Sequence, residues 1–378
     1  MSRPKPFALE VYFSKWEFKA QYHMCASDMQ STTISELLSM AEDADQEVWK
    51  DLSLGYTETF GRPGLREAIA TTYESVDPSE VLCFAGGQDA LHAAMRALLA
   101  AEDHAIVITP NYQSSESIPV SICSVTGIPL NAEKNWDLDL QRLRDAIRPD
   151  TRLISINFPN NPTGKVISHD ALHAIVDMAR KQGIWVFSDE VFRFLERKPE
   201  IRLPQVADIY ERGLSLNNMS KAYGLPGLRI GWIACKDKQL LRRMENVRHY
   251  TSLCNSAPSE LLAEIALKAR DQVLERNRNL IARNLPLLTD FFEEYRDLFE
   301  WYIPDGGCIG YPRYLGPEGV EKFTETLVEE SGVLLLPASL FRSDLGPTPV
   351  DRFRVGYGRK NMAEGLSAWR RNLEKKAV

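Results

Sequence analysis

The sequence predicts an α/β protein in which helices cover a mainly parallel sheet and a smaller α+β domain is attached. Between residues 81 and 234, apolar runs of strand length alternate with helical segments, a pattern typical of parallel strands joined by helical crossovers. Beyond residue 236 the pattern changes to long helices followed by short apolar runs. With 378 residues, 44% of them hydrophobic, the chain can form one large and one smaller domain.

Seven strands are predicted in the middle of the chain. Each is a short apolar run bounded by turn residues, and the segments between several of them have helical periodicity. The predicted strands are 81–84, 105–109, 118–125, 153–157, 184–188, 214–218 and 230–234, with helices at 90–100, 138–147 and 170–181. Ligands of such a sheet bind at the carboxyl ends of its strands.

Both ends of the chain are expected to form the smaller domain. Residues 1–50 combine an aromatic-rich start with a helical pattern at 34–44, which must bury its apolar face against another element. A loop at 54–66 leads to a helix at 65–73, and the C-terminal part contains helices at 238–250, at 260–292 with a bend, and from Met362. Short strands are expected at 301–303, 308–312, 333–336 and 353–357. We therefore expect a large domain at 51–280 and a small domain built from 1–50 and 281–378.

Composition excludes several classes of function. The net charge is −7 and there is no basic run, so nucleic acid is not an expected partner. The apolar runs are shorter than the ~18 to 20 residues that a membrane span needs, and the first residues lack the apolar region of a secretory signal. The six cysteines are scattered without a CxxC pair and the six histidines have no metal-ligand spacing. We expect a cytoplasmic protein with reduced thiols and no metal.

One glycine-rich turn holds a lysine between two apolar runs. In this lysine loop, residues 220–232, Lys221 and Arg229 are flanked by segments that are expected to be buried. A lysine in a surface loop is normally a solvated cation. A desolvated lysine has a lowered pKa, and its neutral amine can act as a nucleophile or a base.

Other strand ends carry groups that would complement such a lysine. The run 86–88, Gly-Gly-Gln, precedes a helix, whose N-terminus can bind an anion, although glycine there often marks only a turn. Asp189 follows a buried strand, as a helix cap or as the partner of a cation, and Arg229 offers a bidentate fork for an anion. A lysine, a phosphate site and a carboxylate are what pyridoxal phosphate needs: a Schiff base, an anchored phosphate and a protonated ring nitrogen.

These motifs resemble those of the class I/II (fold-type I) pyridoxal-phosphate-dependent aminotransferases. The lysine loop, the turn 160–164 (Asn-Asn-Pro-Thr-Gly), the strand end 188–190 (Ser-Asp-Glu), the segment 56–66 and the strand 353–357 occur in the family's order over most of the chain. The resemblance implies the fold-type I architecture, with a seven-stranded-type sheet. It also implies a homodimer with shared active sites, and an amino acid and a 2-oxo acid as substrates.

The resemblance also assigns roles to residues at the cofactor ring. Lys221 forms the internal aldimine and moves the proton between the substrate Cα and the cofactor C4′. Asp189 pairs with the pyridine nitrogen, and Asn161 binds the ring O3′ beside the substrate. Tyr112 stacks on the ring face, with ordinary aromatic packing as the alternative.

Further roles concern the phosphate and the substrate carboxylate. Gly87, Gln88 and Arg229 would hold the phosphate, with Ser220 or Asn218 helping. Tyr56 would reach the phosphate of the neighbouring subunit, with aromatic packing again as the alternative. Arg354 would grip the substrate α-carboxylate as a fork.

The chain departs from the common pattern in three places. Phe192 stands where many relatives carry a tyrosine that donates to O3′, and Asn218 where many carry a serine. The N-terminal substrate loop is replaced by 16–18 (Trp-Glu-Phe) and 26–31, which contains Ser27. These two segments resemble the subgroup that contains capreomycidine synthase and the pyridoxal-phosphate arginine oxidases, so Glu17 either binds a cationic substrate side chain or is a solvated helix residue. Gln30 lies near the position of the oxidases' catalytic histidine, which argues against hydroxylation.

The sequence thus predicts an aminotransferase that passes an α-amino group to a 2-oxo acid. The alternative is an elimination or ring closure on an arginine-like amino acid, as in capreomycidine synthase. A non-catalytic ligand sensor is a third possibility, which the presence of both Lys221 and Asp189 argues against.

Overall fold

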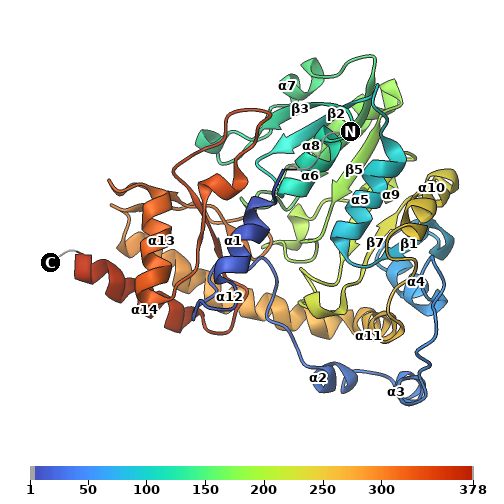
Figure 1. Cartoon of the computed structure of the whole chain (residues 1–378), viewed down its shortest axis with the longest axis horizontal. Coiled ribbons are helices and arrows are strands. Elements are labelled where there is room, and N and C mark those ends of the chain that lie inside the picture. The colour runs from blue at the N-terminus through green and yellow to red at the C-terminus, as the bar shows by residue number, and fades with distance from the viewer. Residues whose placement is uncertain (1–4, 377–378) are drawn as a thin grey trace.

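The computed structural model describes residues 5–376 and contains a seven-stranded sheet between helices (Figure 1). Its strands run in the order β1 (Val81–Phe84), β7 (Gly231–Ala234), β6 (Gly213–Asn218), β5 (Trp185–Asp189), β4 (Thr151–Asn157), β2 (His104–Thr109), β3 (Ser124–Pro129). Strand β7 is antiparallel to both of its neighbours, and the other pairings are parallel. The predicted α/β class and mainly parallel sheet are confirmed.

The central strands are buried along almost their whole length because both faces of the sheet are covered. On β5, Trp185 and Phe187 join the core that contains α5 (Gly87–Leu98), whereas Val186 joins the core that contains α8 (His169–Gln182). Helix α8 begins where the side chain of Ser168 accepts from the backbone N–H of Ala171 and ends at a left-handed glycine, both of which are favourable helix ends.

Three predicted elements are wrong. The predicted strand 301–303 is irregular, because the strand at this point of the chain ends at Glu300. The predicted strand 118–125 is the end of α6 (Gln113–Val120) and the start of β3, because its apolar residues are divided between a helix and an edge strand. The predicted helix 34–44 is two helices, α2 (Ile34–Leu38) and α3 (Asp43–Lys50). Helix α2 begins with a capping box of Thr33 and Glu36 and ends at Ser39.

The C-terminal part forms a smaller α+β unit around aromatic side chains. Strands β11 (Leu336–Pro337), β12 (Phe353–Gly356) and β9 (Ile309–Gly310) form an antiparallel sheet, and β10 (Arg313–Tyr314) pairs with β8 (Phe299–Glu300). Helices α13 (Val320–Ser331) and α14 (Met362–Lys376) cover them. The rings of Phe291 and Trp369, 4.7 Å apart between centroids, lie in this core.

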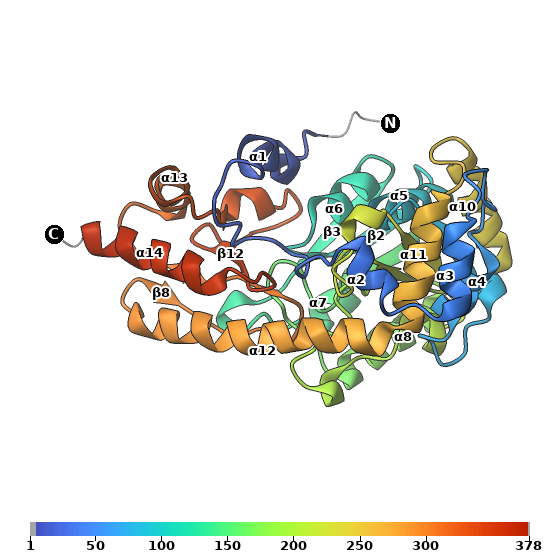
Figure 2. The ribbon, with the colours of Figure 1, turned by 90° about the horizontal axis from the view of Figure 1, so that it is seen from below.

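Two helices join this unit to the helices of the large sheet. The predicted helix 260–292 is divided at Ala269 into α11 (Ala257–Lys268) and α12 (Arg270–Glu294), and α12 runs from α11 to the C-terminal strands (Figure 2). Helices α4 (Pro63–Ala70) and α10 (Lys238–His249) lie on the large-sheet side, as do α2 and α3, which pack against α11.

The first helix, α1 (Ala8–Trp16), lies close to the C-terminal unit, and Tyr22 pairs with Val333. Residues 5–50 therefore contact both parts of the fold, and the predicted domain boundaries stay a prediction. None of the helices within residues 5–376 is long and apolar enough to cross a membrane.

Candidate active site

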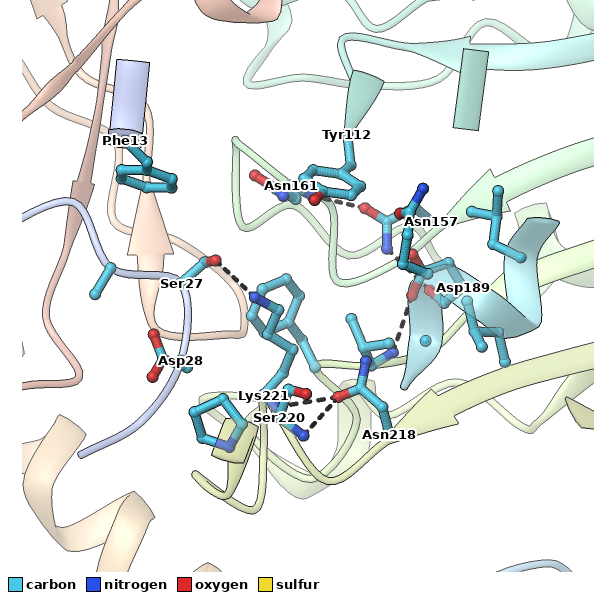
Figure 3. Close-up of a pocket in the computed structure, with 18 of the residues that line it drawn as sticks. Phe13, Ser27, Asp28, Tyr112, Asn157, Asn161, Asp189, Asn218, Ser220 and Lys221 are labelled. Carbon is cyan, nitrogen blue, oxygen red and sulfur yellow. Dashed lines mark hydrogen bonds between the residues drawn. The ribbon is translucent and has the colours of Figure 1, made fainter. Parts of the chain in front are cut away.

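A cavity of about 530 Å³ lies at the carboxyl ends of β4, β5 and β6 (Figure 3). Parallel strands bring their carboxyl ends to one edge of the sheet, so side chains that are far apart in sequence meet there. Predicted site residues that line the cavity are Glu17, Ser27, Gly87, Gln88, Tyr112, Asn161, Asp189, Asn218, Ser220, Lys221 and Arg229. Two predicted site residues do not line the cavity. Arg354 lies behind Asn161 and contacts it, and Tyr56 lines a separate hollow.

The lysine loop directs its amine into the cavity. At the end of β6, the Oδ1 of Asn218 accepts from the backbone N–H groups of Ser220 at 2.9 Å and Lys221 at 3.1 Å, which fixes the turn. The Nζ of Lys221 donates to the Oγ of Ser27 at 2.9 Å (Figure 3). Burial, the largest effect, lowers the pKa of Lys221, so its amine loses its proton more easily than that of an ordinary lysine.

Asp189 is a buried carboxylate whose charge lacks a close partner. It ends β5 with 9% of its surface exposed and accepts from the backbone N–H of Val191 at 3.2 Å. Within the described part of the chain, no cationic side chain lies within ion-pair distance of Asp189. Burial raises the pKa of this carboxyl to about 6. A ring nitrogen that carries a proton would supply the missing charge.

Three glycines open a cradle at the N-terminus of α5. A Cβ on Gly87 would lie 2.7 Å from the Nδ2 of Asn218, and a Cβ on Gly231 would lie 2.7 Å from the backbone nitrogen of Gly87. A Cβ on Gly86, whose φ is +91°, would meet the Nη2 of Arg229. The absence of these Cβ atoms lets a helix N-terminus, an amide and a guanidinium converge, which suits a phosphate. The residues therefore fit the phosphate, ring nitrogen and aldehyde of pyridoxal phosphate.

Tyr112 lines the cavity from the start of α6. Its hydroxyl donates to the Oε1 of Glu10 on α1 at 3.1 Å, and its ring centroid lies 5.1 Å from that of Phe7. Burial raises the pKa of Tyr112. The hydrogen bond between Tyr112 and Glu10 therefore connects α1 to the rim of the cavity.

Arg354 lies behind the cavity wall and contacts Asn161. The guanidinium on β12 is 1% exposed; its Nη1 donates to the Oδ1 of Asn161 at 3.1 Å, and its Nε and Nη2 donate to the backbone oxygen of Cys25 at 3.1 and 2.9 Å. Burial lowers the pKa of Arg354. Asn161 in turn donates its backbone N–H to Asn157 at 2.8 Å.

The side of the cavity near α1 is acidic. Burial raises the pKa of Glu17, and the neighbouring carboxylates of Glu10 and Asp28 raise it further. Asp28 pairs with Arg359, which also lines the cavity. Phe192 lines the cavity wall. It occupies the position at which the resemblance to the family predicts a tyrosine.

The cavity residues that the sequence prediction did not assign include Glu10, His23, Asp28, Asn157 and Arg359. Two had a usable signal, because Asp28 follows the predicted Ser27 and Asn157 ends a predicted strand. Asn157 faces Asp189 in the register of β4 and β5 and donates to its backbone oxygen at 2.9 Å.

Tyr56 is 91% exposed and lies outside the cavity, in a separate hollow of about 500 Å³ between α3 and the start of α11. A single chain therefore does not bring Tyr56 to the other site residues. In residues 5–376, no three His, Cys, Asp or Glu side chains are grouped in a way that could hold a metal ion.

Known proteins match this chain along most of its length. The family model Aminotransferase class I and II matches residues 24–368. The chain is 27% identical to capreomycidine synthase of Streptomyces vinaceus, over 95% of this chain and 92% of that protein. It is 28% identical to the arginine–pyruvate transaminase AruH of Pseudomonas aeruginosa, over 80% and 77% of the two chains. A crystal structure of a PLP-dependent aminotransferase from Streptococcus suis 89-1591 superposes with a TM-score of 0.91 at 29% identity, covering 99% of both chains.

Proposed function

The chain belongs to the class I and II aminotransferase family, and on this premise we propose that Lys221, Asp189 and the glycine cradle form the site where it moves an α-amino group. Its dependence on pyridoxal phosphate and its fold type are as predicted from the motifs. The observation that supports the assignment of residues is their convergence: the amine of Lys221, the unpaired carboxylate of Asp189 and the cradle beside Arg229 line one cavity.

Each part of the cofactor has a candidate partner in the cavity. Gly87, Gln88 and Arg229, with Asn218 and Ser220, would hold the phosphate. Asp189 would hold the positive charge of the ring nitrogen, Asn161 would bind the ring oxygen, and the ring of Tyr112 would cover one face. The cofactor, when bound, supplies an aldehyde carbon that takes the amino group and a ring that withdraws electrons from the substrate Cα.

Lys221 then has two tasks. Its neutral amine would attach the cofactor as a nucleophile, and once freed by the substrate the same amine would take the proton from the substrate Cα. The hydroxyl of Ser27, 2.9 Å from Nζ, orients the amine. Arg354 would hold the substrate α-carboxylate with Asn161, to whose Oδ1 it already donates. Over the whole reaction the donor would leave as a 2-oxo acid, and its amino group would pass to a second 2-oxo acid.

Glu17 is proposed to bind a cationic side chain of the amino donor. It lies on the acidic side of the cavity, beside Glu10 and Asp28. One relative is named as an arginine–pyruvate transaminase, which supports an arginine-like donor.

The second candidate function is elimination or ring closure on such an amino acid. The observation that favours it is Phe192, which cannot donate a hydrogen bond to the ring oxygen, so the electronics of the cofactor would differ from those of a tyrosine-containing site. The similarity to capreomycidine synthase supports the same alternative.

A spectroscopic titration separates the two candidates. Arginine, lysine and aromatic amino acids are added singly to the cofactor-loaded protein. Conversion to a stable form absorbing near ~330 nm, reversed by a 2-oxo acid, is the result expected for transamination. A persistent band near ~500 nm without that form would refute transamination and favour elimination or ring closure.

We also propose that two copies share their active sites, with Tyr56 of each chain reaching the phosphate in the other. Tyr56 and Leu54 are 91% and 82% exposed, beside an apolar hollow of about 500 Å³. The expected solution mass is twice the 42.8 kDa of one chain, and a monomer would contradict the shared sites.

Since all six cysteines are free, a reducing compartment such as the cytoplasm is proposed. Six thiols per chain are expected to titrate after unfolding without reductant, and fewer thiols would contradict this proposal.

A further inference from the structure

We propose that Arg359, held by Asp28 in the wall of the active-site cavity, binds the distal carboxylate of a dicarboxylic 2-oxo acid acceptor such as 2-oxoglutarate. The inference rests on the proposed transamination and names its second substrate. Arg359 itself has no task in the proposed transamination mechanism.

Arg359 offers donors that its partner does not occupy. Its Nη2 donates to both carboxylate oxygens of Asp28, at 3.0 Å to Oδ1 and 2.9 Å to Oδ2. Within residues 5–376, the Nε and Nη1 of Arg359 make no hydrogen bond, since both bonds to Asp28 come from Nη2. A guanidinium has five N–H donors in a planar fork that fits a carboxylate. With 24% of the Arg359 side chain and 17% of the Asp28 side chain exposed, a ligand in the cavity can reach the pair.

The ion pair is not needed to hold its two segments together. The backbone N–H of Gln30 donates to the oxygen of Gly358 at 2.7 Å, and the backbone N–H of Lys360 donates to the Oε1 of Gln30 at 3.3 Å. The segments that carry Asp28 and Arg359 are thus already joined. A partly exposed ion pair adds little stability beyond that, so a purely structural role explains its place in the cavity poorly.

The other cavity cations already have tasks or partners. Arg229 lies at the glycine cradle, Lys221 donates to Ser27, and Arg354 is bonded behind the wall to Asn161 and Cys25. Arg359 therefore remains for the side chain of a substrate.

An aminotransferase must accept two side chains in one cavity, one from the donor and one from the acceptor. An ion pair offers both signs of charge. When a distal carboxylate enters, it takes the free donors of Arg359 and competes with Asp28 for Nη2. When a cationic donor enters, Asp28 is available to it beside Glu17.

The test compares ligands with and without a distal carboxylate. Arg359→Gln is expected to raise KM for 2-oxoglutarate, relative to KM for pyruvate, by roughly 10- to 100-fold, since charge-assisted hydrogen bonds are lost. Arg359→Lys keeps the charge but loses the bidentate fork. Its KM ratio is expected to lie between those of the wild type and Arg359→Gln. Lys360→Gln removes the neighbouring exposed cation and is expected to keep the wild-type ratio.

A binding measurement separates this inference from the proposed function, because it needs no turnover. In calorimetry on the cofactor-loaded protein, glutarate is expected to bind more tightly than propionate, and Arg359→Gln to remove most of that preference. Asp28→Asn frees the guanidinium and is expected to preserve or strengthen glutarate binding. Equal weakening by Asp28→Asn and Arg359→Gln would show a structural ion pair, and a wild-type protein without the preference would also overturn the inference. A wild type that prefers glutarate but transaminates nothing would instead refute the proposed function.

Discussion

Lys221→Ala is expected to abolish transamination, with kcat lower by roughly 10²- to 10⁴-fold or more. The amine has two tasks in the proposed mechanism, attachment of the cofactor and removal of the Cα proton, and alanine can perform neither. Burial lowers the pKa of Lys221, so the wild-type amine is neutral, and therefore reactive, at a lower pH than that of an exposed lysine. Single-turnover measurements with an amino donor give the rate directly.

Covalent attachment provides a second readout that does not depend on turnover. After borohydride reduction and unfolding, the wild-type chain is expected to keep the cofactor's added mass on the peptide that contains Lys221. The Lys221→Ala chain is expected to lose it. Lys238→Ala, which removes an exposed lysine at the start of α10, is the matched control and is expected to behave as wild type. Retained turnover by Lys221→Ala would refute the assignment of this lysine.

Much of the fold and of the cavity could be predicted because parallel strands place their ends together. Asp189 and Asn218 each end a buried apolar run that is easily recognised in the sequence, and Lys221 follows the second run. The division of residues 118–125 could not be predicted, because an apolar segment that spans a helix end and a strand start has the composition of a strand.

The acidic and basic residues near α1 were missed for a different reason. Asp28 and Arg359 are 331 residues apart, and only the folded chain brings them into contact. Neither residue has the local neighbours that would mark it in the sequence as part of an ion pair. Tyr56 was predicted from its motif, but its proposed contact needs a second chain.

Asp189→Asn is expected to have opposite effects on activity and on the stability of the cofactor-free protein. Activity should fall by roughly 10²-fold or more, because an amide cannot balance the charge of a protonated ring nitrogen. The unfolding free energy at pH 8 should rise. Burial raises the pKa of Asp189 from 3.8 to about 6, so ionising the folded protein costs about 3 kcal/mol more than ionising the unfolded chain. Asparagine keeps the acceptor for the N–H of Val191 without that cost.

The sign of the pH dependence makes the Asp189 prediction specific. The folded carboxyl binds its proton more tightly than the unfolded one, so the cost is absent below the unfolded pKa of 3.8, grows as pH rises to about 6, and is constant above. The gain from Asp189→Asn, measured by urea unfolding of the cofactor-free protein, should therefore be present at pH 8 and nearly absent at pH 4. Glu190→Gln is the matched control, because burial raises the pKa of Glu190 to about 7 and its Oε1 accepts from Ser215, outside the cavity. Glu190→Gln should also raise the unfolding free energy at pH 8, but without loss of transamination. A gain from Asp189→Asn that is equal at both pH values would show that packing, not the buried charge, is responsible.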